Sequence, residues 1–167
     1  GFTVTMDTRN TQPVTGIAEN FQQTLAQAGV KLEIIPGDGK QTLTKYRARQ
    51  HDMYIGQWGS DYFDPNSNAE TFTANPDNSD EGKVKTLAWR NAWDPKELDA
   101  ETKAALLEKD TAKRAAMYED LQRKVMESGP FVMIYQQVEV AAFSAKLKGF
   151  RLGPSFDTNL VYSVSKE

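Results

Sequence analysis

The chain has 167 residues, of which 39% are hydrophobic and 26% charged, with a formal net charge of −3. This composition is typical of a globular domain, and the slightly acidic balance argues against a nucleic-acid partner. The chain has no Cys and one His, which excludes a disulfide, a Cys nucleophile and a structural zinc site within it. No residue pattern calls for a cofactor.

No apolar run approaches the about 20 residues that a bilayer-spanning helix needs, so direct membrane insertion is not expected. The first residues already have the pattern of a strand, and no secretory signal precedes them. We therefore expect a piece of a longer protein.

The first 60 residues alternate strand and helix patterns. Apolar residues two apart indicate strands with one buried face, and spacings of three and four indicate amphipathic helices. The β-α-β-α-β order predicts right-handed crossovers and a largely parallel sheet flanked by helices, an α/β fold. The expected elements are Phe2–Met6, Pro13–Ala28, Val30–Ile34, a short helix around Leu43 and Tyr46, and Met53–Trp58.

The second half is predicted to be helical and then extended. Asp64-Pro65 and Asp94-Pro95 each place a capping carboxylate before a Pro at the first helical position. A further helix is predicted to end at Gly129-Pro130, and residues 146–167 have weaker periodicity. The expected elements are the helix Thr111–Ser128 and strands at Phe131–Tyr135 and Val138–Phe143.

Acidic residues dominate one stretch of the chain. Seven of them, and no Lys or Arg, lie between His51 and Gly82, and all but the first follow the third predicted strand: Asp52, Asp61, Asp64, Glu70, Asp77, Asp80 and Glu81. Ligands of open α/β sheets bind beyond the carboxyl ends of the strands. With Trp58, Tyr62 and Phe63 nearby, this loop suits a ligand that carries a cation and some apolar surface. For Asp64, Asp77 and Asp80, helix capping and turn formation are the more ordinary roles.

Two further patterns have competing interpretations. Asp61 and Asp64 are candidates for the carboxylate pair of a glycoside hydrolase, but two acids across a helix start are far more often a cap and its neighbour. Trp89 and Trp93 have helical spacing, which favours a packed pair with Arg90 exposed over a ligand role for Arg90.

The run from Asp52 to Pro65, DMYIGQWGSDYFDP, resembles the binding-lobe segment of the extracytoplasmic solute-binding proteins of oligopeptide, dipeptide and nickel ABC importers (family 5). The stretches AGVKLEI from Ala28 to Ile34 and ALLEKDTAKRAAMYEDLQRKVMESGPFVMIY from Ala105 to Tyr135 follow the same family order. The resemblance implies the C-terminal lobe of a type II periplasmic binding protein, located in the periplasm or otherwise outside the cytoplasm.

The resemblance also implies a division of the chain and a set of partners. Residues 1–145 would form the ligand-binding lobe, and residues 146–167 would return to an absent first lobe. The whole protein would be noncatalytic and would capture a peptide or small organic solute between its lobes for ABC permease subunits. The alternatives are the hydrolase using Asp61 and Asp64, and an interaction module, which burial of Trp58 and Tyr62 in the core would favour.

Site residues carried over from the family lie in one short segment. Asp61 would receive the ligand's ammonium group, and Trp58 would form an aromatic wall, with Tyr62 beside it. The main chains of Gln57 and Gly59 would pair with an extended peptide. Peptide binders of this family place Arg residues near this strand for the ligand carboxylate, but here the nearest are Arg47 and Arg49. No metal ligand is expected.

Overall fold

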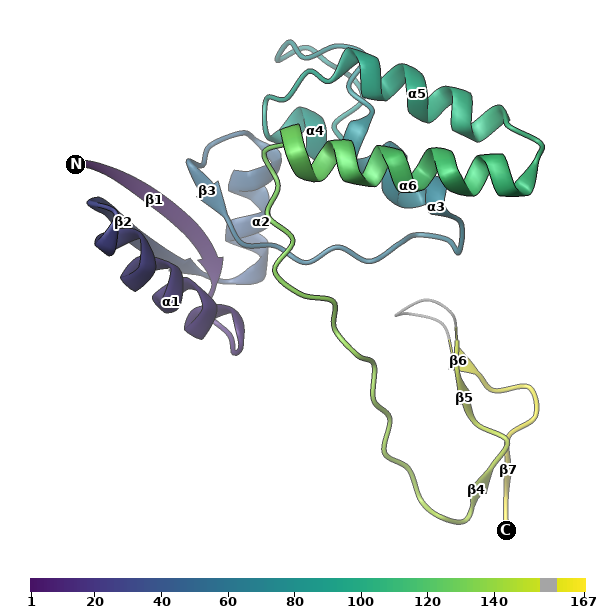
Figure 1. The fold of residues 1–167 in the computed structure, drawn as a ribbon. Coiled ribbons are helices and arrows are strands. Elements are labelled where there is room, and N and C mark those ends of the chain that lie inside the picture. Colours follow the sequence, from purple (N-terminus) through teal and green to yellow (C-terminus); the bar gives the residue numbers. More distant parts are fainter. Residues whose placement is uncertain (154–158) are drawn as a thin grey trace.

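The computed structural model describes residues 1–153 and 159–167. Its N-terminal part is a three-stranded sheet in the order β2-β1-β3 (Figure 1). The strands β1 (Phe2–Arg9), β2 (Val30–Gly37) and β3 (Met53–Tyr54) are parallel. Helices α1 (Val14–Gln27) and α2 (Gly39–Arg47) connect them. The predicted β-α-β-α-β order and the parallel sheet are confirmed.

The central strand β1 is buried on both faces at its carboxyl end. Met6 packs with α1 in a core that also contains Val14, Ala18 and Leu32. The next residue, Asp7, is only 1% exposed and bonds Lys45 Nζ of α2 at 2.5 Å. The expected alternation of one buried and one exposed face is therefore wrong here, because a helix covers each side of the sheet.

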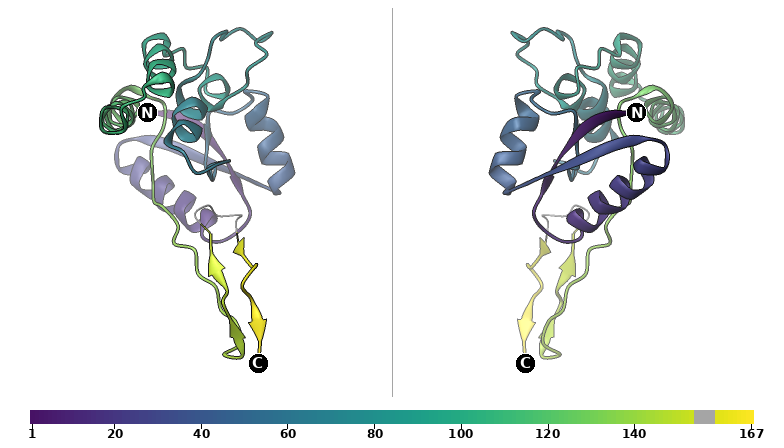
Figure 2. Two further views of the ribbon diagram at one scale, coloured as in Figure 1. Left: turned by 90° about the vertical axis from the view of Figure 1, so that its right-hand side faces the viewer. Right: turned by 90° about the vertical axis from the view of Figure 1, so that its left-hand side faces the viewer.

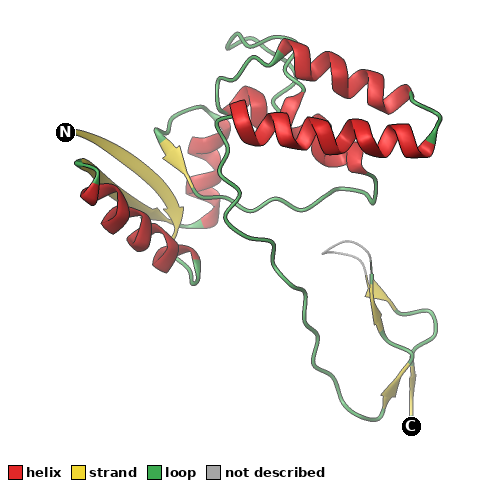
Figure 3. Cartoon of the chain, viewed as in Figure 1, coloured by secondary structure: helices red, strands yellow, loops and turns green. Residues whose placement is uncertain are grey.

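A helical layer packs beside the sheet (Figure 3). Its second core consists of residues from α5 and α6: Leu98, Ala105, Tyr118, Leu121 and Val125. The layer comprises α3 (Pro65–Thr73), α4 (Leu87–Arg90), α5 (Lys96–Leu107) and α6 (Thr111–Ser128).

The predictions for helix starts divide into one success and one failure. Asp64 caps α3 by accepting the Asn66 amide at 2.8 Å, as predicted, and α6 has the predicted bounds. Asp94 does not cap α5, which begins at Lys96 without a side-chain cap; the Asp94 carboxylate lies 3.4 Å from Lys96 Nζ instead.

Arg49, which lies between α2 and β3, contacts α4 and the loop that precedes α4. Its guanidinium lies 3.7 Å from the ring centroid of Trp89, donates to the Trp89 carbonyl at 2.5 Å and donates to the Asn78 carbonyl at 2.9 Å. The predicted Trp89–Trp93 helical pair is wrong, because α4 ends at Arg90 and Trp93 packs against Phe131.

Beyond Phe131 the chain runs away from the helical layer in an extended path (Figures 1 and 2). The strands predicted at 131–135 and 138–143 are not formed, since no described segment pairs with this stretch; Val132, Val138 and Val140 are 76%, 80% and 87% exposed. The chain ends in two small antiparallel ribbons. They pair β4 (Leu147–Lys148) with β7 (Ser165–Lys166), and β5 (Arg151–Leu152) with β6 (Asn159–Leu160).

We predict that Arg49→Ala lowers the free energy of unfolding by about 2 to 3 kcal/mol, because it removes a cation stacked on Trp89 and three partly buried hydrogen bonds to Trp89 and Asn78. Urea denaturation measures this effect. Arg47→Ala is the matched control: Arg47 is exposed, and the change should stay within about 0.5 kcal/mol. Equal losses for the two variants would contradict the role of Arg49.

Candidate functional site

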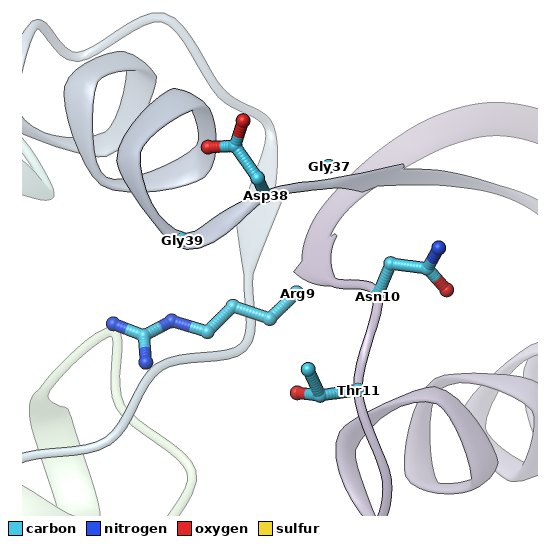
Figure 4. A pocket seen from close by; sticks show the side chains of 6 residues that line it. All are labelled: Arg9, Asn10, Thr11, Gly37, Asp38 and Gly39. Atoms are coloured by element: carbon cyan, nitrogen blue, oxygen red, sulfur yellow. The ribbon is translucent and has the colours of Figure 1, made fainter.

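The carboxyl ends of all three strands lie at one edge of the sheet. β1 ends at Arg9, β2 at Gly37 and β3 at Tyr54, and the parallel register places these ends together. The chain continues from β3 along this edge, where the Ile55 amide donates to the Asp7 carbonyl at 3.1 Å. Figure 4 shows an open pocket of about 460 Å³ here, lined by Arg9, Asn10, Thr11, Gly37, Asp38 and Gly39.

The segment after β3 is fastened to the start of α3. Trp58 Nε1 and Ser60 Oγ both donate to Asn68 Oδ1, at 2.9 and 2.7 Å, and the Asp61 amide donates to Ser67 Oγ at 3.1 Å. These hydrogen bonds to the side chains of Ser67 and Asn68 fix the orientation of the loop relative to α3.

The aromatic groups of this loop remain accessible. Trp58 is 39% exposed and Tyr62 is 49% exposed, so neither lies in the core. The main chains of Gln57 and Gly59 make no hydrogen bond with any residue that the structure describes. These groups are therefore available to a ligand.

The two acids of this loop have different environments. Asp61 is exposed, and its carboxylate accepts no hydrogen bond within the described ranges. Asp64 caps α3 and also receives two bonds from the Arg114 guanidinium, at 2.8 and 3.0 Å. The structure thus separates an available carboxylate from one that is fully engaged.

Asp64 belongs to a network that ties α3 to α6. Arg114 also donates to the Tyr118 hydroxyl at 3.2 Å, and this hydroxyl donates to Asn66 Oδ1 at 3.1 Å. The Arg114 guanidinium and the Asn66 amide hold the pKa of the Asp64 carboxyl below its usual range. A glycosidase acid needs a raised pKa, so Asp64 has the wrong shift for the proton donor of a carboxylate pair.

The other acids singled out by sequence have ordinary roles. Asp77 accepts the Ser79 amide at 2.9 Å in a turn, as predicted. Asp80 is exposed and lies 3.5 Å from Arg49, an ion pair that the sequence did not indicate.

Sequence reasoning missed Arg9. The nearest arginines that it considered were Arg47 and Arg49, of which Arg49 is occupied by Trp89 and Asn78 and Arg47 lies at the far end of α2. Arg9 is partly buried, ends the central strand and lines the edge pocket. Its position at the end of the first strand of a βαβ unit was the available signal.

Arg90 was the other arginine for which a ligand role was considered. It donates to the Lys85 carbonyl at 3.0 Å.

Comparison with known proteins supports an assignment to a family. Residues 1–80 match the model of bacterial extracellular solute-binding proteins, family 5, middle part. These first 80 residues are therefore similar to the family 5 solute-binding proteins. The family consists of binding proteins and not of enzymes.

Relatives extend the similarity along the chain. The peptide transport periplasmic protein SapA of Salmonella typhimurium is 26% identical over 150 residues, which cover 90% of this chain and 26% of SapA. The di/tripeptide-binding protein 2 of Pseudomonas aeruginosa is 25% identical, over 83% of this chain and 25% of its own length. The chain thus spans about a quarter of the length of the curated relatives that it matches.

A solved structure shows the same fold. The dipeptide-binding protein of Pseudoalteromonas sp. SM9913, in complex with Met-Leu, superposes on this chain with a TM-score of 0.79 and 22% identity. The superposition covers 100% of this chain and 32% of that protein. The predicted type II periplasmic binding protein fold is confirmed.

Two absences concern the described residues alone. Residues 1–153 and 159–167 contain no group of three or more His, Asp or Glu side chains placed to hold a metal ion. Within the same ranges, none of the helices is both long and apolar enough to span a bilayer.

We predict that Asp64→Asn costs about 1 kcal/mol of stability near neutral pH, where the half-buried bidentate pair with Arg114 is lost but capping is retained. Because the folded-state pKa of Asp64 lies below the usual 3.8, its contribution is present above that value and disappears as the pH falls through the folded-state pKa.

The free-energy difference between wild type and Asp64→Asn should therefore be largest above about pH 5 and should disappear as the pH falls through the lowered folded-state pKa of Asp64. Chemical denaturation across this range measures it. Asp61→Asn serves as control and should remain within about 0.5 kcal/mol of wild type at neutral pH. A difference for Asp64→Asn that grew at low pH would contradict the assignment.

Proposed function

We propose that this chain is the ligand-binding lobe of the substrate-binding component of an ABC importer, and that it takes a peptide or similar small zwitterionic solute. One observation carries the proposal. The loop from β3 to α3 has an available carboxylate at Asp61, and the strand edge has a guanidinium at Arg9 that lies within 4.0 Å of no carboxylate oxygen among the described residues. Groups of opposite charge on the segments that leave this edge suit a ligand with an ammonium and a carboxylate group.

Asp61 is assigned to the ligand's ammonium group. Its exposure in this lobe leaves it available to a cation, and closure of a second lobe would remove water around the pair. Trp58 and Tyr62 supply apolar surface next to it, since both rings are partly exposed and Trp58 is held by Asn68.

Arg9 is assigned to the ligand's carboxylate group. Its planar fork matches two carboxylate oxygens, and it emerges from β1 next to the segment that carries Asp61. Between these two ends, the unpaired main chains of Gln57 and Gly59 would bond an extended peptide as an added strand.

The remaining parts of the proposal follow from the relatives. SapA and the di/tripeptide-binding protein are named as periplasmic or peptide-binding proteins, so we place this protein in the periplasm with ABC permease subunits as partners. Residues 146–167, whose paired strands lie apart from the sheet, are assigned to contact with a first lobe.

The test is native mass spectrometry of the full-length protein with whatever ligand co-purifies, followed by calorimetry with the dipeptide Met-Leu. A bound peptide or zwitterion supports the proposal. Turnover of a glycoside would favour the hydrolase, and the absence of any small-molecule binding would favour an interaction module. The exposure of Trp58 and Tyr62 already argues against that module.

We predict that Asp61→Asn in the full-length protein weakens Met-Leu binding at least about a hundredfold, because a charge-assisted bond in a closed cleft is lost. Calorimetry measures the affinity. N-acetyl-Met-Leu, which has no ammonium group, should bind wild type and variant equally weakly. Asp64→Asn should change the affinity no more than about threefold. A larger loss there would mean that Asp64, and not Asp61, binds the ligand's ammonium group.

The same assay tests the other end of the ligand. Arg9→Gln should weaken Met-Leu binding about a hundredfold or more, since a bidentate charged contact is removed. Met-Leu amide lacks the carboxylate and should lose little further affinity with this variant. Arg47→Gln is the control and should match wild type. An equal loss for Met-Leu and its amide would remove Arg9 from the carboxylate site.

A further inference from the structure

Tyr54 lies on the face of the sheet from which Arg9 projects. Tyr54 pairs with Asp7 in the parallel register, and Asp7 contacts Lys45 on α2, so both side chains point to the α2 side. Arg9 follows Asp7 by two residues and therefore points to the same side. The register thus places Tyr54 next to the arginine that ends β1.

The Arg9 side chain runs across the start of α2, as Figure 4 shows. A Cβ atom at Gly39 would lie 3.4 Å from Arg9 Nε and 3.5 Å from its Cζ, which locates the guanidinium against this glycine. Burial raises the pKa of the Tyr54 phenol, and the positive charge of Arg9 is the main influence that opposes this rise.

The Tyr54 ring itself is held rigidly. It stacks on Tyr46 with a centroid distance of 4.2 Å and an angle of 14°. The Tyr46 hydroxyl accepts a bond from Asn91 Nδ2 at 2.8 Å, which ties the stack to the residue after α4. The edge of the Tyr54 ring lies so close to Gly56 that a Cβ atom there would collide with Cε1.

We propose that Tyr54 is a positioning residue: its hydroxyl accepts from Arg9 and orients the guanidinium fork toward the anionic end of the ligand. This inference rests on the proposed function. A guanidinium has five donors, and a fixed acceptor for one of them restricts the rotation of the others. A ring that stacks on Tyr46 and has its edge against Gly56 supplies such an acceptor without further loss of conformational entropy on binding.

Tyr54→Phe is the central variant, because it retains the stack and removes only the hydroxyl. In the full-length protein we expect Met-Leu to bind about fivefold to tenfold more weakly, and Met-Leu amide to bind within about twofold of wild type. In an Arg9→Gln background the same substitution should have no further effect. Equal losses for both ligands, or a loss that persists without Arg9, would overturn the inference.

Tyr46→Phe is the matched control. It also removes one hydroxyl from the stack, but the partner of that hydroxyl is Asn91 and not Arg9. Met-Leu affinity should stay within about twofold of wild type. A loss as large as that of Tyr54→Phe would show that the stack acts only through general packing, and would overturn the specific role of Tyr54.

A measurement without ligand separates this inference from the proposed function. In deuterated protein labelled on arginine, ¹⁵N relaxation of Arg9 Nε, assigned with Arg9→Lys, reports how strongly the guanidinium is held. Tyr54→Phe should make Arg9 Nε more mobile, and Tyr46→Phe should not. Unchanged mobility in Tyr54→Phe would overturn the inference whatever the protein binds. Failure of every peptide to bind wild type would overturn the proposed function, while the relaxation result would still decide whether Tyr54 holds Arg9.

Discussion

The parallel pairing of β1 with both of its neighbours is the constraint on which the rest of the structure depends. It brings three strand ends to one edge, with α1 on one face of the sheet and α2 on the other. The carboxyl end of β1 is therefore enclosed, and Asp7 is buried against Lys45. The segments that leave this edge become exposed only beyond it, at Asn10 after β1 and at Gly56–Trp58 after Ile55, where a ligand can approach.

The helical layer has a supporting role toward this edge. Asn68 and Ser67 hold the loop that carries Trp58 and Asp61, while Asp64 links the start of α3 to Arg114 on α6. Loops that bind ligands are usually positioned by rigid elements in this way. The Asp64 carboxylate is engaged by Arg114, whereas the Asp61 carboxylate, three residues earlier, stays available.

The different environments of Asp61 and Asp64 also distinguish a binding site from a hydrolase site. Acid catalysis by a carboxyl group requires an environment that favours the protonated form, which means burial or a second negative charge. Arg114 favours the charged form of Asp64. Asp64 is therefore unsuited to the proton-donor role of a glycosidase, which agrees with the similarity of residues 1–80 to solute-binding proteins.

The sequence by itself determined the local elements and the segment that carries the candidate site. Alternating apolar residues, the Asp64-Pro65 cap and the Gly129-Pro130 stop are local signals, because each depends on neighbours within one turn or strand. It also placed Trp58 at the end of the third predicted strand and Asp61 just after it, although the strand itself ends at Tyr54. What it could not show were contacts between distant residues: the Arg49–Trp89 stack, the Asp64–Arg114 pair and the position of Arg9 against Gly39. Only the tertiary structure decides these contacts, because the acceptor that each guanidinium finds lies far away along the chain. The strands predicted at 131–135 and 138–143 failed for the same reason, since a strand needs a distant partner strand.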